Sequence, residues 1–215
     1  MHKRTFSSFV FQLTRIHNPR RTARRRRVSG HILFTLRRGS GTPKANERFE
    51  GASEREREKM MKNRFMARAI ELSIEGVQSG RGGPFGAVVV KDGEILGEGV
   101  NQVTSTKDPS AHAEMLAIRM ACAKLGSFEL KNCELYTSCE PCPMCLGAIY
   151  WARLARVYFA NTAEDAAKFG FDDSLIYSEL RQAHTNRRIP VIQMMHEEAL
   201  AGFHAWEANP NKILY

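Results

Sequence analysis

Long apolar runs are absent from the sequence. No stretch approaches the roughly 20 apolar residues that a membrane-spanning helix requires, and residues 9–13 are too short for the apolar core of a signal peptide. The cysteines number only five, which is odd, and two of them form a Cys-x-x-Cys pair, so they do not suit a secreted disulfide framework. We therefore expect a soluble, cytoplasmic protein with reduced thiols and no membrane partner.

Acidic residues are absent from the first 46 residues, which hold twelve Lys and Arg. The rest of the chain carries twenty basic and twenty-three acidic residues, a net charge of −3. A surface that binds a long polynucleotide needs cationic side chains to neutralise phosphates. The charge distribution therefore argues against nucleic acid as the partner and favours a small neutral substrate.

Residues 1–53 show no sustained hydrophobic period, and we expect them to form a disordered basic extension. An Arg-rich segment of this kind is typical of an organelle transit peptide, or it binds RNA or an acidic membrane surface, or it has no role. We favour the last interpretation because nothing in the segment repeats or matches a binding motif. Residues 54–215 have the length of one domain with a single core.

The expected domain alternates helices and strands. A helix starts at Ser53 and ends at the glycines of residues 80–83, and residues 87–90 and 94–100 form a hairpin around Asp92-Gly93. Further helices are expected at residues 111–125, 143–152 and 197–206, and further strands at residues 134–138, 156–160 and 190–195. This order predicts an α/β fold of three layers, α/β/α, around a central mixed sheet of five strands.

The strongest motif is His112-Ala113-Glu114, followed 28 residues after the Glu by Cys142-Pro143-Met144-Cys145, with Pro141 directly before it. This is the H-x-E and P-C-x-x-C signature of zinc deaminases. Zn²⁺ takes imidazole nitrogen and thiolate sulfur in a tetrahedron, and three protein ligands leave one position for water. The motif therefore predicts a zinc ion held by His112, Cys142 and Cys145, each at the start of a predicted helix, where the backbone favours thiolates.

Glu114 follows His112 by two residues, so on a helix the two side chains point about 200° apart but both border one cleft at the first turn. Zinc lowers the pKa of its bound water to about 7, and a nearby carboxylate can move that proton to a ring nitrogen of the substrate. Attack on an amidine-like carbon then releases ammonia. We therefore expect Glu114 to carry the protons of a hydrolytic deamination, with zinc as the only cofactor.

Two other interpretations of the Cys-x-x-Cys pair are a structural zinc site and a redox pair without metal. A structural site requires four protein ligands. The remaining candidates, His184, His196 and His204, lie far downstream in polar or helical surroundings. None of these three histidines is an obvious fourth ligand, and Glu114 lies next to His112. Both observations favour a catalytic zinc site over a structural one.

Four segments resemble the cytidine deaminase-like superfamily and, within it, the bacterial guanine deaminases. They are residues 82–87 (GGPFGA), 108–114 (DPSAHAE), 137–145 (TSCEPCPMC) and 170–173 (GFDD), and the resemblance extends from about residue 60 to residue 215. It implies a cytidine deaminase-like fold and the conversion of guanine to xanthine by attack at C2. It also implies a domain-swapped homodimer in which the C-terminal segment closes the partner's site.

The resemblance also implies roles for individual side chains. Asn101 would hydrogen-bond the purine base, Phe85 would stack on it, and Asp173 would meet its polar edge or assist proton transfer. The remaining substrate-binding positions would be Ala113 beside the base, Trp151 in the pocket wall and Tyr215, which would reach into the neighbouring subunit. Structural alternatives stay open: the two aromatic residues Phe85 and Trp151 suit a core, Asn101 suits a strand end, and Asp173 suits a helix N-cap.

Other activities share parts of the pattern. The tRNA adenosine deaminases have the zinc motif but typically a Leu before the Glu, where this chain has Cys139 before Glu140, and residues 171–173 follow the guanine-specific pattern. A guanosine or ammeline aminohydrolase is a third possibility. A non-enzyme alternative is an RNA-binding protein on a deaminase scaffold, which has no need of Glu114 as a proton carrier.

Overall fold

The computed structural model describes residues 53–215, which all belong to one structural unit. We predicted that residues 1–53 are disordered. Of these, only Ser53 belongs to the described part of the chain, and residues 1–52 lie outside it. Among the helices of residues 53–215, none combines the length and the apolar composition that crossing a membrane requires.

The first helix, α1 (Glu54–Gln78), starts where the sequence predicts. The Ser53 side chain accepts from the backbone N–H of Glu56, and the Glu56 carboxylate accepts from the N–H of Ser53, which is a capping box. The buried face of α1 includes Phe65 and Leu72. The helix ends at Ser79, and Gly80 follows with a positive φ of 68°, which glycine adopts without strain.

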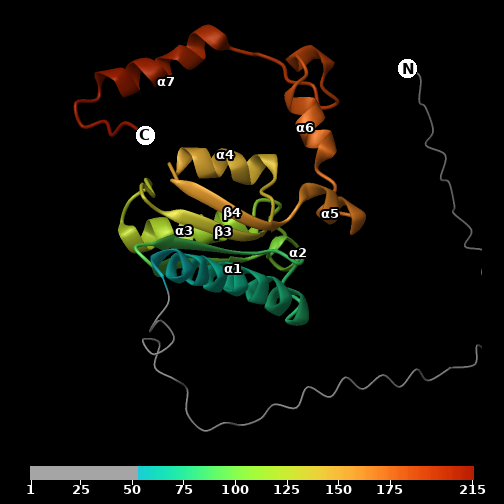
Figure 1. The fold of residues 1–215 in the computed structure, drawn as a ribbon. Helices are drawn as coiled ribbons and strands as arrows, with labels where there is room; N and C mark the ends of the chain where they lie inside the picture. Colours follow the sequence, from blue (N-terminus) through green and yellow to red (C-terminus); the bar gives the residue numbers. More distant parts are fainter. Residues whose placement is uncertain (1–52) are drawn as a thin grey trace, which may run out of the picture. The chain divides into compact units, whose positions relative to one another are not determined.

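The sheet has the order β2-β1-β3-β4, and Figure 1 labels its last two strands. Its strands are β1 (Gly86–Lys91), β2 (Glu94–Val100), β3 (Glu134–Cys139) and β4 (Arg156–Asn161). β1 pairs antiparallel with both β2 and β3, whereas β3 and β4 are parallel. A parallel pair requires a crossover connection, which α4 (Pro143–Trp151) supplies here. The predicted hairpin is confirmed, and Asp92 and Gly93 both have positive φ at its turn.

The sheet of the described residues has four strands, so the predicted fifth strand is wrong. Residues 190–195 form no strand, and Ile192 and Met194 are largely exposed. An apolar β-branched run becomes a strand only where a neighbouring strand supplies hydrogen bonds and a packed face. In this structure the sheet ends at β4, and the run extends beyond it without a partner strand.

Helices cover both faces of the sheet, which confirms the predicted three layers. Side chains of a strand alternate between the faces, so Val88 and Val90 pack with Phe65 and Leu72 of α1. Ala87 and Val89 pack instead with α3 (Ala113–Leu125), and Ile149 of α4 (Pro143–Trp151) joins this second cluster. Figure 1 shows α1 on one side of the strands and α4 on the other.

The C-terminal part of the chain is helical and exposed. The predicted closing helix is confirmed as α7 (His196–Ala208), which has no buried residue. Sequence analysis did not anticipate four short elements, which are α2 (Val103–Thr106), α5 (Ala163–Lys168), α6 (Ser174–Leu180) and the 3₁₀ helix His184–Asn186. Of these elements, α2 lies between β2 and α3 in the chain, and the other three lie between β4 and α7.

Candidate active site

The three predicted metal ligands lie together at the N-terminal ends of two helices. His112 is the N-cap of α3, Cys142 is the N-cap of α4, and Cys145 is in the first turn of α4. Nδ1 of His112 lies 3.5 Å from Sγ of each cysteine. Tetrahedral zinc with ordinary bond lengths places nitrogen and sulfur ligands about 3.6 Å apart. The donor types and their spacing therefore fit a zinc ion.

Electrostatics in this group favour one thiolate. The hydrogen bond from Cys145, and then that from His112, lowers the pKa of Cys142 to about 4 against the opposing effect of burial. The same hydrogen bond, together with burial and the nearby Glu114, raises the pKa of Cys145. Contact with the Cys142 thiolate raises the pKa of His112. Because a zinc ligand must be deprotonated, metal binding displaces the proton of Cys145.

The group has three members among the described residues, and no fourth His, Cys, Asp or Glu joins it. His184 lies in the 3₁₀ helix, and His196 and His204 lie in α7. This arrangement matches a catalytic site with one open position and not a closed structural site.

Glu114 lies beside the metal ligands in the first turn of α3, and only 5% of its surface is exposed. Its Oε2 lies 3.5 Å from Sγ of Cys145, and its Oε1 accepts a hydrogen bond from the Thr137 hydroxyl at 3.2 Å. Burial raises the pKa of Glu114. A carboxylate that is adjacent to the metal group and easier to protonate than usual suits a proton carrier.

Asn101 follows β2 and is 6% exposed. Its Oδ1 accepts from the backbone N–H of Gly83 at 3.2 Å and of Val103 at 3.3 Å. These two hydrogen bonds identify which end of the Asn101 amide is the oxygen. The Nδ2 amino group at the other end then remains available to a ligand. A Cβ at Gly82 would lie 2.6 Å from this Oδ1, so glycine there is what allows the close approach. Asn101 can therefore present donors to a ligand.

Phe85 and Asp173 border the same end of the sheet. The Phe85 ring packs edge to face on Phe171, with centroids 4.9 Å apart. A cavity of about 500 Å³ adjoins it, lined by Ser73, Pro84, Phe85, Cys139, Asn161, Asp165, Ala166, Phe169 and Phe171. Asp173 is the N-cap residue of α6, but its side chain makes no capping hydrogen bond. Burial, and then the Cys142 thiolate, raises the pKa of Asp173.

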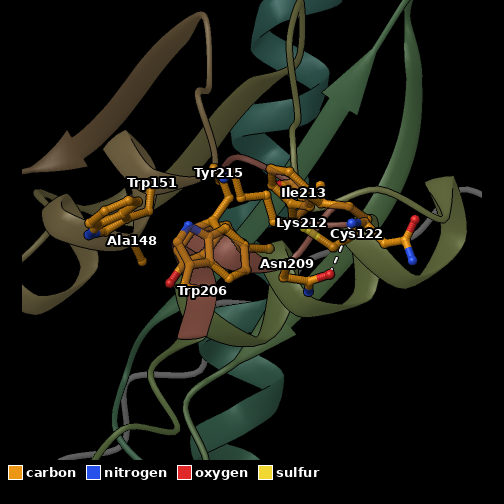
Figure 2. A pocket seen from close by; sticks show the side chains of 12 residues that line it. Cys122, Ala148, Trp151, Trp206, Asn209, Lys212, Ile213 and Tyr215 are labelled. Carbon is orange, nitrogen blue, oxygen red and sulfur yellow. Dashed lines mark hydrogen bonds between the residues drawn. The ribbon is translucent and has the colours of Figure 1, made fainter. Parts of the chain in front are cut away.

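Trp151 and Tyr215 lie together but away from the metal ligands of their own chain. Trp151 ends α4, nine residues after Cys142, and this corresponds to about 13 Å along a helix. The Tyr215 ring contacts Trp151, Trp206 and Phe128 with centroids 5.9 to 6.3 Å apart. Figure 2 shows Trp151, Trp206 and Tyr215 close together. They line a cavity of about 820 Å³, whose lining contains no metal ligand. The remaining expected residue, Ala113, is fully buried in the core between α3 and the sheet.

Sequence analysis missed three polar residues that hold the site. Thr137 contacts Glu114, as described above. The hydroxyl of Ser138 accepts from the backbone N–H of Gly86 at 3.0 Å, next to Phe85. Glu140 accepts from the N–H of Ala163 at 3.0 Å, which joins the metal-binding loop to α5. For Thr137 and Ser138 the available signal was the presence of hydroxyl residues inside an otherwise apolar strand, because buried polar groups require partners.

Comparison with known proteins agrees with this geometry. Residues 59–161 match the family described as the cytidine and deoxycytidylate deaminase zinc-binding region. Guanine deaminase from Bacillus subtilis (strain 168) is 56% identical over 151 residues, which cover 70% of this chain and 97% of that relative. The X-ray structure of guanine deaminase from Bacillus subtilis superposes with a TM-score of 0.70 at 55% identity and covers 71% of this chain and 98% of that one.

The tRNA-specific adenosine deaminase of Aquifex aeolicus (strain VF5) is 43% identical over 101 residues, which cover 47% of this chain and 66% of that relative. The zinc motif, the geometry of its ligands and the identity over nearly the whole length of a relative all agree. The chain therefore belongs to the cytidine and deoxycytidylate deaminase family of zinc-binding hydrolases.

Proposed function

We propose that this protein is a guanine deaminase, which hydrolyses guanine to xanthine and ammonia. The observation that carries the proposal is the extent of similarity. The likeness to the Bacillus subtilis guanine deaminase spans 151 residues and 97% of that relative, whereas the likeness to the Aquifex aeolicus tRNA-specific adenosine deaminase spans 101 residues at lower identity.

Each group of the site then has a role. Zinc, held by His112, Cys142 and Cys145, would supply an activated water at neutral pH. Glu114, whose Oε2 faces the metal ligands, would carry one proton of that water to a ring nitrogen. It would then carry the second proton, from the hydroxyl group newly bonded to the ring carbon, to the leaving amino group. Asp173 assists at the polar edge of the base and Phe85 stacks on its face, whereas Ala113, which is fully buried, packs in the core behind the pocket.

The orientation of Asn101 suits the binding of a purine base. Its Oδ1 is already used by two backbone N–H groups, so the amide presents hydrogen-bond donors to the base. Guanine accepts such a bond at its carbonyl oxygen or at a ring nitrogen, so the orientation of Asn101 suits a purine base.

We also propose that the protein acts as a domain-swapped homodimer. Large apolar side chains that are 40% to 79% exposed crowd the C-terminal segment, residues 189–215. They are Ile189, Val191, Ile192, Met194, Met195, Phe203, Trp206, Ile213, Leu214 and Tyr215. Apolar surface on this scale favours association. In such a dimer Tyr215 of one subunit closes the site of the other, and Trp151 lies in the wall between them.

Ammonia release tests the proposed substrate. The full-length, zinc-loaded protein is incubated separately with guanine, guanosine, adenine, cytosine, ammeline and an adenosine-bearing tRNA stem-loop. We expect guanine to be the fastest substrate by a wide margin. Glu114→Gln is the control, because it keeps the metal ligands and removes the proton carrier. Faster release from the stem-loop or from guanosine would contradict the proposal.

A further inference from the structure

The face of β3 that packs against α3 is apolar except at Thr137. Leu135 on this face belongs to one core cluster with Ala87 and Val89 of β1. Thr137, two residues further along β3, lies opposite Ala87 in the ladder and is fully buried. A hydroxyl in such surroundings destabilises the fold unless it forms a hydrogen bond.

The hydrogen bond of Thr137 goes to Glu114. The hydroxyl donates to Oε1 at 3.2 Å and so joins β3 to the first turn of α3. The other carboxylate oxygen, Oε2, lies 3.5 Å from Sγ of Cys145, which is a metal ligand. The two oxygens of Glu114 therefore face different groups: one faces the sheet and the other faces the metal centre.

We propose that Thr137 is a positioning residue for the proton transfers of Glu114. Because the hydroxyl holds Oε1, rotation of the carboxylate is restricted and Oε2 stays directed at the metal group and the substrate. The inference rests on the proposed role of Glu114 in deamination. We expect Thr137 to affect the rate of the chemical step. It should not affect substrate binding, because Thr137 lies behind the Glu114 carboxylate, within the core.

Valine tests this role because it has nearly the shape of threonine but cannot donate a hydrogen bond. In Thr137→Val the packing of β3 against α3 is kept, and Glu114 loses its anchor. Small misplacements of a reacting group lower rates strongly, so we expect kcat to fall roughly tenfold to a hundredfold. KM and zinc content should stay at the wild-type values. Thr137→Ser, which keeps the donor, should restore most of kcat.

Two further variants separate positioning from a general effect of losing a buried hydroxyl. Tyr136→Phe removes the hydroxyl of a buried side chain on the opposite face of β3, where it donates to the Glu134 carboxylate at 2.8 Å, and it should leave kcat unchanged. In a Glu114→Gln background, Thr137→Val should lower the residual rate no further, because the group that Thr137 positions is already gone.

The measurements are kcat, KM and bound zinc of the full-length protein, made with the base that the wild-type protein converts fastest. A wild-type protein that prefers a base other than guanine would refute the proposed substrate and leave the comparison of variants intact. A Thr137→Val protein with wild-type kcat would overturn the role of Thr137. The same conclusion would follow if Thr137→Ser were as slow as Thr137→Val, or if zinc content fell in step with activity.

Discussion

Gly99 of β2 lies directly against the backbone of Ala113 in the first turn of α3: a Cβ at position 99 would lie 1.9 Å from the Ala113 carbonyl oxygen. This contact places α3 on the sheet, and with it the N-cap His112 and Glu114. The glycine is required for space and not for an unusual φ. The position of the metal centre therefore depends on a residue that has no chemistry of its own.

Gly99→Ala should accordingly displace α3. We expect a loss of about 1–3 kcal/mol in the free energy of unfolding, which is typical of overpacking, together with weaker zinc retention. Thermal unfolding and metal analysis of the purified variant measure both. Gly147→Ala is the matched control, because a Cβ there meets nothing within 4 Å and position 147 is helical. Equal stability of the two variants would show that the close approach does not matter.

Glu140 links the metal-binding loop to α5. Its carboxylate accepts from the N–H of Ala163 at the start of α5, and its own N–H donates to the Asn161 carbonyl oxygen at 2.8 Å. Removing a carboxylate from a helix N-terminus typically destabilises by about 1 kcal/mol. Glu140→Ala should therefore loosen the loop before Cys142 and speed zinc loss.

Transfer of zinc to a chromophoric chelator measures that rate for Glu140→Ala and for the wild type. With saturating zinc, kcat should recover, because Glu140 holds the loop and does not contact the metal group. Glu164→Ala serves as the control, since this acidic residue lies in the same first turn of α5 and is not part of the loop. A kcat that stays low at saturating zinc would argue against a purely supporting role.

The Arg68–Glu98 pair joins α1 to β2 and predicts a pH dependence of stability. Nε and Nη2 of Arg68 donate to the two carboxylate oxygens of Glu98 at 2.9 and 2.8 Å. The hydrogen bond from Arg68 holds the pKa of Glu98 below its ordinary value of 4.5. Because the folded-state pKa is the lower one, the pair stabilises above about pH 4.5 and loses this effect as the pH falls through the folded-state pKa.

Glu98→Gln should thus destabilise the protein at pH 7, by about 1 kcal/mol for a pair near the surface. The difference from wild type should shrink as the pH falls below 4.5. Denaturant unfolding of both proteins at several pH values between 3 and 7 provides the comparison, and acid-induced zinc loss affects both alike. A difference that is independent of pH would mean that the charge of Glu98 contributes nothing.

Local patterns predicted the metal ligands and Glu114, because the motif spacing and the helix starts are properties of short segments. The contacts that hold these residues were not predictable in this way. Thr137 meets Glu114 across 23 residues of chain, and Asn101 meets Gly83 across 18, so both contacts depend on how β1, β3 and α3 pack. The prediction of a fifth strand was wrong for a related reason. Residues 190–195 have the composition of a strand, but no strand of the sheet lies beside them to pair with.

The proposed exchange of C-terminal segments predicts complementation between two inactive proteins. Removal of Tyr215 should lower activity without loss of zinc, because Tyr215 lies among Trp151, Trp206 and Phe128 and away from the metal ligands. Glu114→Gln should also be inactive, but its C-terminal segment is intact. In a mixed dimer the intact segment of the Glu114→Gln subunit closes the intact site of the truncated subunit.

Unfolding and refolding the two proteins together should therefore restore activity, towards half of the wild-type rate per mixed dimer. Each protein refolded alone is the control, and size-exclusion chromatography reports the oligomeric state. If Tyr215 closed only the site of its own chain, the truncated subunit would keep an open site and the Glu114→Gln subunit would keep a closed site without a proton carrier. Mixing would then restore nothing, so an inactive mixture of well-formed dimers would refute the exchange.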